Sequence, residues 1–214
     1  MKFEFIYEPV PLIIIRDVFT KKENTEIFAE AIKNKSSFKP AKTGDNIENF
    51  RTNISSHYDI LYAKDRTKSK LLSIIDNIFS NRKLNQIFTS FSSLPINDIM
   101  KTSSHETQVS RYGDQGQDYK YHIDSSGIDG RLITFVYYFN VTPKKYKGGE
   151  IQFTKSPIYD GMVVDGSETP ITITPENNMM VVFGSKTAHT VLPTTSSKAF
   201  NKGRFSVNIW VGNQ

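Results

Sequence analysis

The chain contains no cysteine. This absence excludes disulfide bonds, thiolate-bound zinc and a thiol nucleophile, and it favours a reducing compartment. Long hydrophobic runs are lacking too. The apolar run Leu12 to Ile15 is too short for the hydrophobic region of a signal peptide, and no run approaches membrane-spanning length. We therefore expect a cytoplasmic protein that does not associate with membranes.

The sequence has only a small excess of charge of one sign. It contains 27 Lys and Arg against 22 Asp and Glu, a net charge of +5, and these residues are spread along the chain. Dispersed lysines are more typical of a solvated surface than of a nucleic-acid interface. Nucleic acid is therefore not the expected partner.

The first half of the chain reads as a helical support region with one N-terminal strand, within a single domain over residues 1–214. Val10 to Ile15 predicts the strand, and the spacing of Thr20 and Glu23 predicts a capping box that opens a helix to about Lys35. A second helical pattern runs from about Lys64 to Phe91, with a break near Ser80. The polar residues 36–48 between these helices predict a loop.

The pattern changes at Thr107, where the helical support region (1–106) gives way to a β core over residues 107–211. Short apolar segments separated by turn residues predict eight strands: Thr107 to Tyr112, Tyr119 to Asp124, Leu132 to Phe139, Gly149 to Thr154, Ile171 to Thr174, Met179 to Phe183, Ala188 to Leu192 and Arg204 to Val211. Eight strands suit a jelly roll, a double-stranded β-helix, so the predicted class is α+β and mainly β. The segment Pro157 to Pro170 is expected to form a lip over the site.

A candidate metal site begins at His122 and Asp124. Two residues apart on a predicted strand, their side chains project from the same face. His189, which follows Asp124 by 65 positions, would complete a set of two histidines and one carboxylate. This set leaves positions open for substrate and dioxygen at non-heme Fe(II), and it could also hold zinc or manganese. The other two histidines, His57 and His105, lie outside this pattern.

The last predicted strand carries a polar stripe. Arg204 follows His189 by 15 positions, and Ser206, Asn208 and Trp210 share its face by the period of two. The interior of a barrel is normally apolar, so this stripe favours a binding site. An Arg there can clamp a carboxylate with two parallel hydrogen bonds.

HxD, a distant His and RxS on a final strand together resemble the Fe(II)- and 2-oxoglutarate-dependent dioxygenases, and most of all the prolyl 4-hydroxylase-like family. The segment QVSRYGDQGQDYKYHID resembles the family's approach to the HxD. DGRLITFVYYFN is similar to the strand that follows it in the hypoxia-sensing prolyl hydroxylases, and GGEIQF, NMMVVFGSKTAHTVLP and GRFSVNIWV resemble later strands. The resemblance covers roughly Thr107 to Val211.

The resemblance implies a ligand set and a cosubstrate site. It makes His122, Asp124 and His189 the Fe(II) ligands and Arg204, with Ser206, the site for the distal carboxylate of 2-oxoglutarate. Tyr138 and then Tyr112 are the aromatic candidates at that carboxylate, and Arg131 and Trp210 are candidates for substrate contact.

The implied reaction hydroxylates an unactivated C–H bond, with dioxygen as the second cosubstrate, ascorbate as an auxiliary reductant, and succinate and carbon dioxide as products. A prolyl residue of a protein or peptide is the expected target. A free amino acid or another small molecule stays open, as does a non-catalytic jelly-roll module that binds a metal or ligand. Nucleic-acid demethylases carry RxNxTxR on the last strand, whereas Trp210 stands here in place of the second Arg. Oligomeric state is left open.

Overall fold

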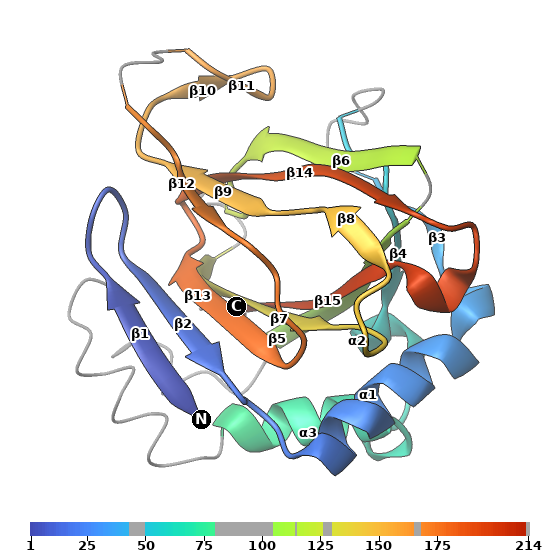
Figure 1. The fold of residues 1–214 in the computed structure, drawn as a ribbon. Coiled ribbons are helices and arrows are strands. Elements are labelled where there is room, and N and C mark those ends of the chain that lie inside the picture. The colour runs from blue at the N-terminus through green and yellow to red at the C-terminus, as the bar shows by residue number, and fades with distance from the viewer. Residues whose placement is uncertain (43–49, 80–104, 114, 126–129, 165–167, 213–214) are drawn as a thin grey trace.

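The computed structural model describes residues 1–42, 50–79, 105–113, 115–125, 130–164 and 168–212 (Figure 1). Its strands are β1 (Lys2–Ile6), β2 (Leu12–Arg16), β3 (Lys39–Pro40), β4 (Ile54–His57), β5 (His105–Tyr112), β6 (Gln115–His122), β7 (Arg131–Phe139), β8 (Tyr146–Gly148), β9 (Ile151–Thr154), β10 (Ile158–Tyr159), β11 (Met162–Val163), β12 (Ile171–Ile173), β13 (Met179–Gly184), β14 (Ala188–Ser196) and β15 (Arg204–Gly212). The helices are α1 (Lys21–Lys33), α2 (Tyr58–Leu61) and α3 (Lys70–Phe79), with short 3-10 turns η1 (Lys35–Ser37), η2 (Arg66–Lys68) and η3 (Phe200–Lys202).

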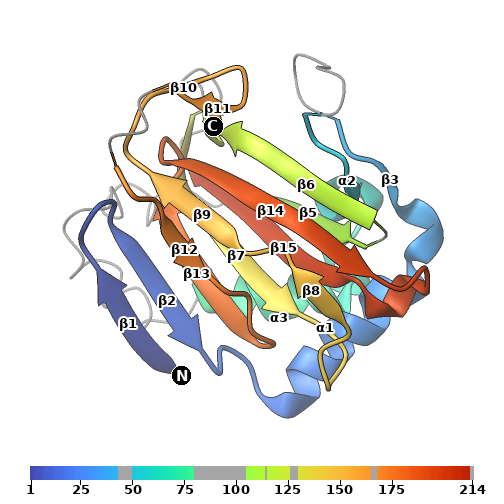
Figure 2. The same ribbon diagram turned by 45° about the horizontal axis from the view of Figure 1, so that its top comes forward.

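Two sheets face one another and enclose the core (Figure 2). The large sheet has eight strands in the order β1-β2-β13-β7-β15-β5-β4-β3. The small sheet has five, with β12-β9-β14-β6 in order and β8 paired to β14, while β10 and β11 form a separate hairpin. The predicted jelly roll and its mainly β class are confirmed. All eight predicted strands are present, although several bounds differ by a few residues.

The central strands of the large sheet are buried on both faces, because the helices cover its outer side (Figure 1). Its strands alternate between two cores. Tyr137 of β7 belongs to the core under α1 and α3, whereas Tyr138 belongs to the core between the sheets. The strand β15 lies between β7 and β5, with Ser206 opposite both Tyr138 and Ser110. This register aims one face of β15 into the space between the sheets.

The helix α1 begins at the predicted capping box. The Glu23 amide donates to Thr20 Oγ1 (3.2 Å), and the Thr20 amide donates to Glu23 Oε2 (2.9 Å). Farther along, Glu30 joins α1 to the start of α3, because its carboxylate accepts from the Ser69 hydroxyl (2.6 Å) and the Leu71 amide (2.7 Å). An acceptor is favourable there because the first amides of a helix have no partner within it.

The N-terminal half departs from the predicted helical support region with one strand. It also supplies β1, β3 and β4, so four strands of the large sheet come from residues before 106. The second helical pattern is present as η2 and α3, and its part beyond Phe79, with the predicted break near Ser80, lies outside the described residues. The loop predicted over 36–48 contains most of η1 and all of β3 before residues 43–49, which are also outside. The single domain over 1–214 stays a prediction.

Within the described parts of the chain, no helix is both long and apolar enough to cross a membrane.

Candidate metal and cosubstrate site

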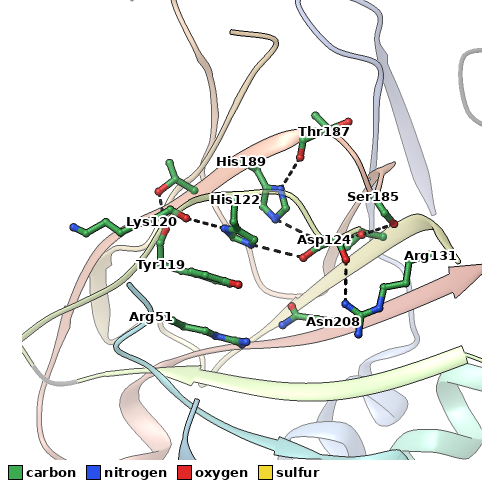
Figure 3. Close-up of polar contacts among 12 residues, drawn as sticks. Arg51, Tyr119, Lys120, His122, Asp124, Arg131, Ser185, Thr187, His189 and Asn208 are labelled. Carbon is green, nitrogen blue, oxygen red and sulfur yellow. Dashed lines mark hydrogen bonds and ion pairs between the residues drawn. The ribbon is translucent and has the colours of Figure 1, made fainter. Parts of the chain in front are cut away.

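His122, Asp124 and His189 converge at one end of the space between the sheets (Figure 3). His122 ends β6 and lies directly opposite His189 on the neighbouring strand β14. The Asp124 carboxylate reaches both rings, with Oδ1 3.7 Å from His122 Nε2 and Oδ2 3.6 Å from His189 Nε2. One potential ligand atom of each residue lies within 4.8 Å of the other two.

Backbone carbonyls set the protonation of both imidazoles. His122 Nδ1 lies 2.7 Å from the carbonyl oxygen of Lys120, and His189 Nδ1 lies 2.9 Å from that of Thr187. A carbonyl can only accept, so each Nδ1 carries a proton, and it is Nε2 of the neutral tautomer that would present a lone pair towards Asp124. Two neutral imidazoles and one carboxylate form the donor set that suits non-heme Fe(II), and zinc or manganese would accept the same donors.

Burial keeps His122 in the neutral form that a metal needs. The pKa of this imidazole lies well below 6.5, first because of burial and second because His189 lies beside it, while the Lys120 carbonyl opposes the shift. Metal binding at His122 near neutral pH therefore displaces no proton from the ring.

We expect the metal-free protein to lose stability as the pH falls below about 6.5. Unfolded His122 takes up a proton near its ordinary pKa, whereas folded His122 stays neutral. The stability present above this pH should decrease by roughly 1.4 kcal/mol per pH unit from this residue alone. Urea unfolding in EDTA at pH 7.5, 6.5 and 5.5 measures the slope. The His122→Asn variant should lack the contribution of His122 to the pH dependence of the unfolding free energy. An equal slope in the variant and in wild type would refute the prediction.

Asp124 does not lie on a strand, contrary to the strand predicted over Tyr119 to Asp124. β6 ends at His122, and Asp124 follows in a bend. Its amide donates to the carbonyl of Ser185 (2.8 Å), and Arg131 Nη1 donates to its carbonyl oxygen (3.0 Å). The Thr134 hydroxyl donates to the carboxylate Oδ2 (2.8 Å). These contacts, and not strand alternation, place the carboxylate between the two imidazoles.

A bulge in β6 turns Tyr119 and His122 to the same side. His122 pairs with His189, and Tyr119 pairs with Val191, so three steps along β6 match two along β14. In a regular strand, the side chains at positions 119 and 122 would face opposite sides of the sheet. The extra residue of the bulge in β6 brings them to the same side. The Tyr119 ring consequently stacks on the His122 imidazole, with centroids 3.5 Å apart and planes 16° apart.

The second half of the site surrounds Arg204, which is 1% exposed. Its guanidinium lies between the rings of Tyr112 and Tyr138, 4.8 Å from each ring centre. Within the described residues, its Nε and Nη1 have no hydrogen-bond partner. The nearby Tyr138 hydroxyl also makes no hydrogen bond of ordinary geometry there. Buried donors are rarely left unpaired, and a carboxylate of 2-oxoglutarate fits this set.

The two tyrosines at Arg204 remain hydrogen-bond donors at neutral pH. Burial raises the pKa of both hydroxyls, Tyr112 and Tyr138, and the positive charge of Arg204 only partly opposes the rise. Gly149 makes room for Arg204, since a Cβ at this glycine would lie 2.5 Å from Arg204 Cδ. Its φ of +75° also favours glycine.

The remaining predicted residues line the same cavity, which has a volume of about 650 Å³. Ser206, Asn208 and Trp210 follow Arg204 along the cavity wall, as the polar stripe predicted. Arg131 lies over the Trp210 ring, 4.4 Å from its centre. Two hydrogen bonds to Glu106 (3.0 and 2.6 Å) hold the Arg131 guanidinium in place.

The β10–β11 hairpin lies at this cavity too, in the segment predicted as a lip over residues 157–170. Ile158, Asp160 and Gly161 line the wall, and the Gly161 carbonyl accepts from the amide of Tyr121 in β6 (3.1 Å). Residues 165–167 lie outside the described part of the chain. The lip itself, a segment that covers the site, stays a prediction.

Several cavity residues were not predicted from the sequence. Arg51, from the segment before β4, lies against Tyr119, and Gln108 of β5 is hydrogen-bonded to Arg51. His57, which the metal pattern excluded, reaches the cavity wall through a bond to Gln108 (2.7 Å). Thr134, whose hydroxyl donates to the Asp124 carboxylate, was not predicted either.

Comparison with known proteins agrees with this geometry. A sequence model of the 2OG-Fe(II) oxygenase superfamily matches residues 107–212. An uncharacterized PKHD-type hydroxylase from Synechocystis sp. is 28% identical over 215 residues, covering 97% of this chain and 65% of the relative. The chain thus spans slightly less than two thirds of the length of that curated relative.

Solved structures share the fold. A prolyl hydroxylase from Trichoplax adhaerens, in complex with a hypoxia inducible factor oxygen degradation domain peptide fragment, has a TM-score of 0.64 at 17% identity, covering 94% of this chain and 83% of that one. A prolyl-4-hydroxylase from Pseudomonas putida has a TM-score of 0.61 at 19% identity, covering 96% and 94%. At these identities the likeness concerns the fold.

The matched region contains the triad and the Arg204 strand, and the fold around them is the one these enzymes share. Residues 107–212 belong to the 2OG-Fe(II) oxygenase superfamily. The PKHD-type relative and the prolyl hydroxylase structures are the proteins that the chain as a whole is similar to.

Proposed function

We propose that this protein is an Fe(II)- and 2-oxoglutarate-dependent dioxygenase that hydroxylates a prolyl residue of a protein or peptide. The observation that carries the proposal is one cavity that holds both halves of the required site. The triad of His122, Asp124 and His189 offers three ligand atoms within 4.8 Å, and Arg204 offers buried, unpaired donors to an anion.

Each group has a role that its contacts support. His122 and His189 present Nε2 to the metal, and Asp124 presents a carboxylate held by Thr134. When bound, Fe(II) supplies the oxidising chemistry, which consumes dioxygen and 2-oxoglutarate and yields succinate, carbon dioxide and the alcohol.

Four residues would hold the distal carboxylate of 2-oxoglutarate. Arg204 would supply the charge, and Ser206, Tyr138 and Tyr112 would donate hydroxyl hydrogen bonds beside it. Charge-assisted bonds in a buried site fix both the position and the orientation of a carboxylate. The cosubstrate would then be held with its other end at the triad.

The prolyl target rests on the likeness to prolyl hydroxylases and on the shape of the mouth. Ile123, between the two HxD ligands, is 42% exposed at the cavity. Trp210 also lines the cavity, and the Arg131 guanidinium lies over its ring. The exposed Ile123 side chain and the Trp210 ring offer apolar contacts that suit a compact apolar ring carried by a polypeptide. Arg131 and Trp210 remain our candidates for substrate contact.

The test compares peptides with a free amino acid. Iron-loaded protein is incubated with 2-oxoglutarate and air, and with either proline-containing peptides or free L-proline, and mass spectrometry detects the gain of one oxygen atom. Hydroxylated peptide with matching succinate is the expected result. Hydroxylation of free L-proline alone would contradict the peptide substrate and favour the small-molecule alternative. Absence of succinate from every reaction would favour a non-catalytic jelly roll. Cytoplasmic location and an effect of ascorbate stay predictions.

A further inference from the structure

We propose that Arg51 and Tyr119 are positioning residues that hold the imidazole of His122 in its metal-binding orientation. The inference rests on the metal site of the proposed function. It adds two side chains, one of them from the N-terminal half of the chain, to the groups on which metal affinity depends.

The three side chains form one stack (Figure 3). Tyr119 lies flat on His122, with centroids 3.5 Å apart. The guanidinium carbon of Arg51 lies 4.7 Å from the centre of the Tyr119 ring. Tyr119 is therefore in contact with the metal ligand on one side and with a cation on the other. Stacked rings and cation–π pairs both fix the relative orientation of their members.

Arg51 is itself anchored to the large sheet. Its Nη2 donates to Gln108 Oε1 (2.6 Å) and to Ser110 Oγ (3.2 Å), both on β5, and its Nε donates to Asn53 Oδ1 (2.8 Å). Three bonds set the plane of the guanidinium. Because His122 belongs to the small sheet, the stack connects a metal ligand to the opposite layer of the fold.

The backbone around Arg51 makes the same connection. Before β4, the Phe50 carbonyl accepts from the Lys120 amide (3.0 Å), and Thr52 exchanges backbone and hydroxyl bonds with Asp118. Residues 50–52 are therefore joined to β6 in the small sheet, whereas β4 pairs with β5 in the large sheet. The segment lines the cavity with Phe50 and Arg51, and Arg51 is the residue that it directs onto Tyr119.

His122 needs such support more than His189 does. His189 is packed against the rings of Phe183 and Phe153, with centroids 4.7 and 5.9 Å away. His122 ends its strand beyond a bulge, one bond joins its Nδ1 to the Lys120 carbonyl, and its ring contacts Tyr119 and the other histidine ligand, His189, whose ring centre lies 4.1 Å away. Outer groups that orient a metal ligand typically change metal affinity by about 10- to 100-fold.

The test measures binding of Mn(II) alone by titration followed with electron paramagnetic resonance, which detects the free ion. Tyr119→Leu should raise the Kd about tenfold, the lower end of the range for groups that orient a ligand. Tyr119→Phe keeps the ring and should stay within about twofold, because the stack needs only the ring face. Tyr121→Leu is the matched control. Tyr121 lies in the same bulge, but its hydroxyl bonds to Gln152 and its amide to the Gly161 carbonyl. Its replacement should not change the Kd.

A double variant tests whether Arg51 acts through Tyr119. Arg51→Gln should weaken Mn(II) binding severalfold in the wild-type background and have no further effect when Tyr119 is already leucine. Melting temperatures identify variants that lose metal because they unfold. If Tyr119→Leu is unstable, Arg51→Gln still tests the proposal, because it leaves the Tyr119 ring in place and creates no cavity beside His122. If wild type binds Mn(II) and both single variants bind it with the same affinity, the positioning role of Arg51 and Tyr119 is refuted and the metal site is not. Failure of wild type to bind Mn(II) would overturn the metal site as well.

Discussion

Replacement of Asp124 by alanine is expected to abolish metal binding and turnover. Asp124 provides the only anionic ligand of the triad, and its carboxylate lies within 3.7 Å of both imidazoles. Without it, two neutral rings remain, which hold a divalent cation weakly. Turnover should fall by roughly a thousandfold or more, the scale on which loss of an essential group acts. Succinate release and Mn(II) affinity measure the two effects.

The matched control for this variant is Asp160→Ala. Asp160 lines the same cavity from the β10–β11 hairpin but is not part of the triad, so its removal changes the cavity charge equally and should leave metal binding intact. The metal-free Asp124→Ala protein should also unfold at no lower temperature than wild type, because a 9% exposed carboxylate is costly to bury without a cation. Retention of tight metal binding by Asp124→Ala would contradict the assignment.

Replacement of Arg204 by methionine is expected to raise the 2-oxoglutarate requirement by about a hundredfold, the effect of losing a buried charge-assisted pair. Metal affinity should change little, since Arg204 belongs to the other half of the cavity. Without ligand, the variant should be no less stable than wild type, because Nε and Nη1 of the buried guanidinium have no partner among the residues that the structure describes.

Thermal unfolding separates the Arg204 effect from a general loss of structure. With Mn(II) present, saturating 2-oxoglutarate should raise the melting temperature of wild type, and Arg204→Met should lose this increase. Arg204→Lys keeps the charge but not the planar fork, so it should recover only part of the affinity. An unchanged 2-oxoglutarate requirement in Arg204→Met would show that the distal carboxylate binds elsewhere.

Much of the fold could be predicted because the strands of the core obey local rules. The predicted strand over Leu132 to Phe139 is present as β7, and the capping box of Thr20 and Glu23 correctly marks the start of α1. The strands β3 and β4 have only two and four residues, and Ser55 and Ser56 give β4 little apolar pattern. Their strand conformation depends on the pairing of β4 with β5 and of β3 with β4 at the edge of the large sheet, which no local pattern reveals.

The site was predictable where its residues lie on regular strands. The period of two places Arg204, Ser206 and Asn208 on one wall, as observed. The same rule fails at β6, because the bulge brings Tyr119 to the face of His122 and Asp124 lies beyond the strand. Arg51 was not identified because its contacts with Tyr119 and β5 join segments more than fifty residues apart.

The central claim is that one cavity binds Fe(II) and 2-oxoglutarate together and activates them for oxidation. The most direct measurement adds Fe(II) and 2-oxoglutarate to the protein without oxygen, records the weak visible charge-transfer absorption of the chelated cosubstrate, and then admits air. We predict that the band appears, that succinate is released in air, and that Asp124→Ala shows neither. A folded, iron-loaded protein that gives no band and no succinate would contradict the oxygenase assignment.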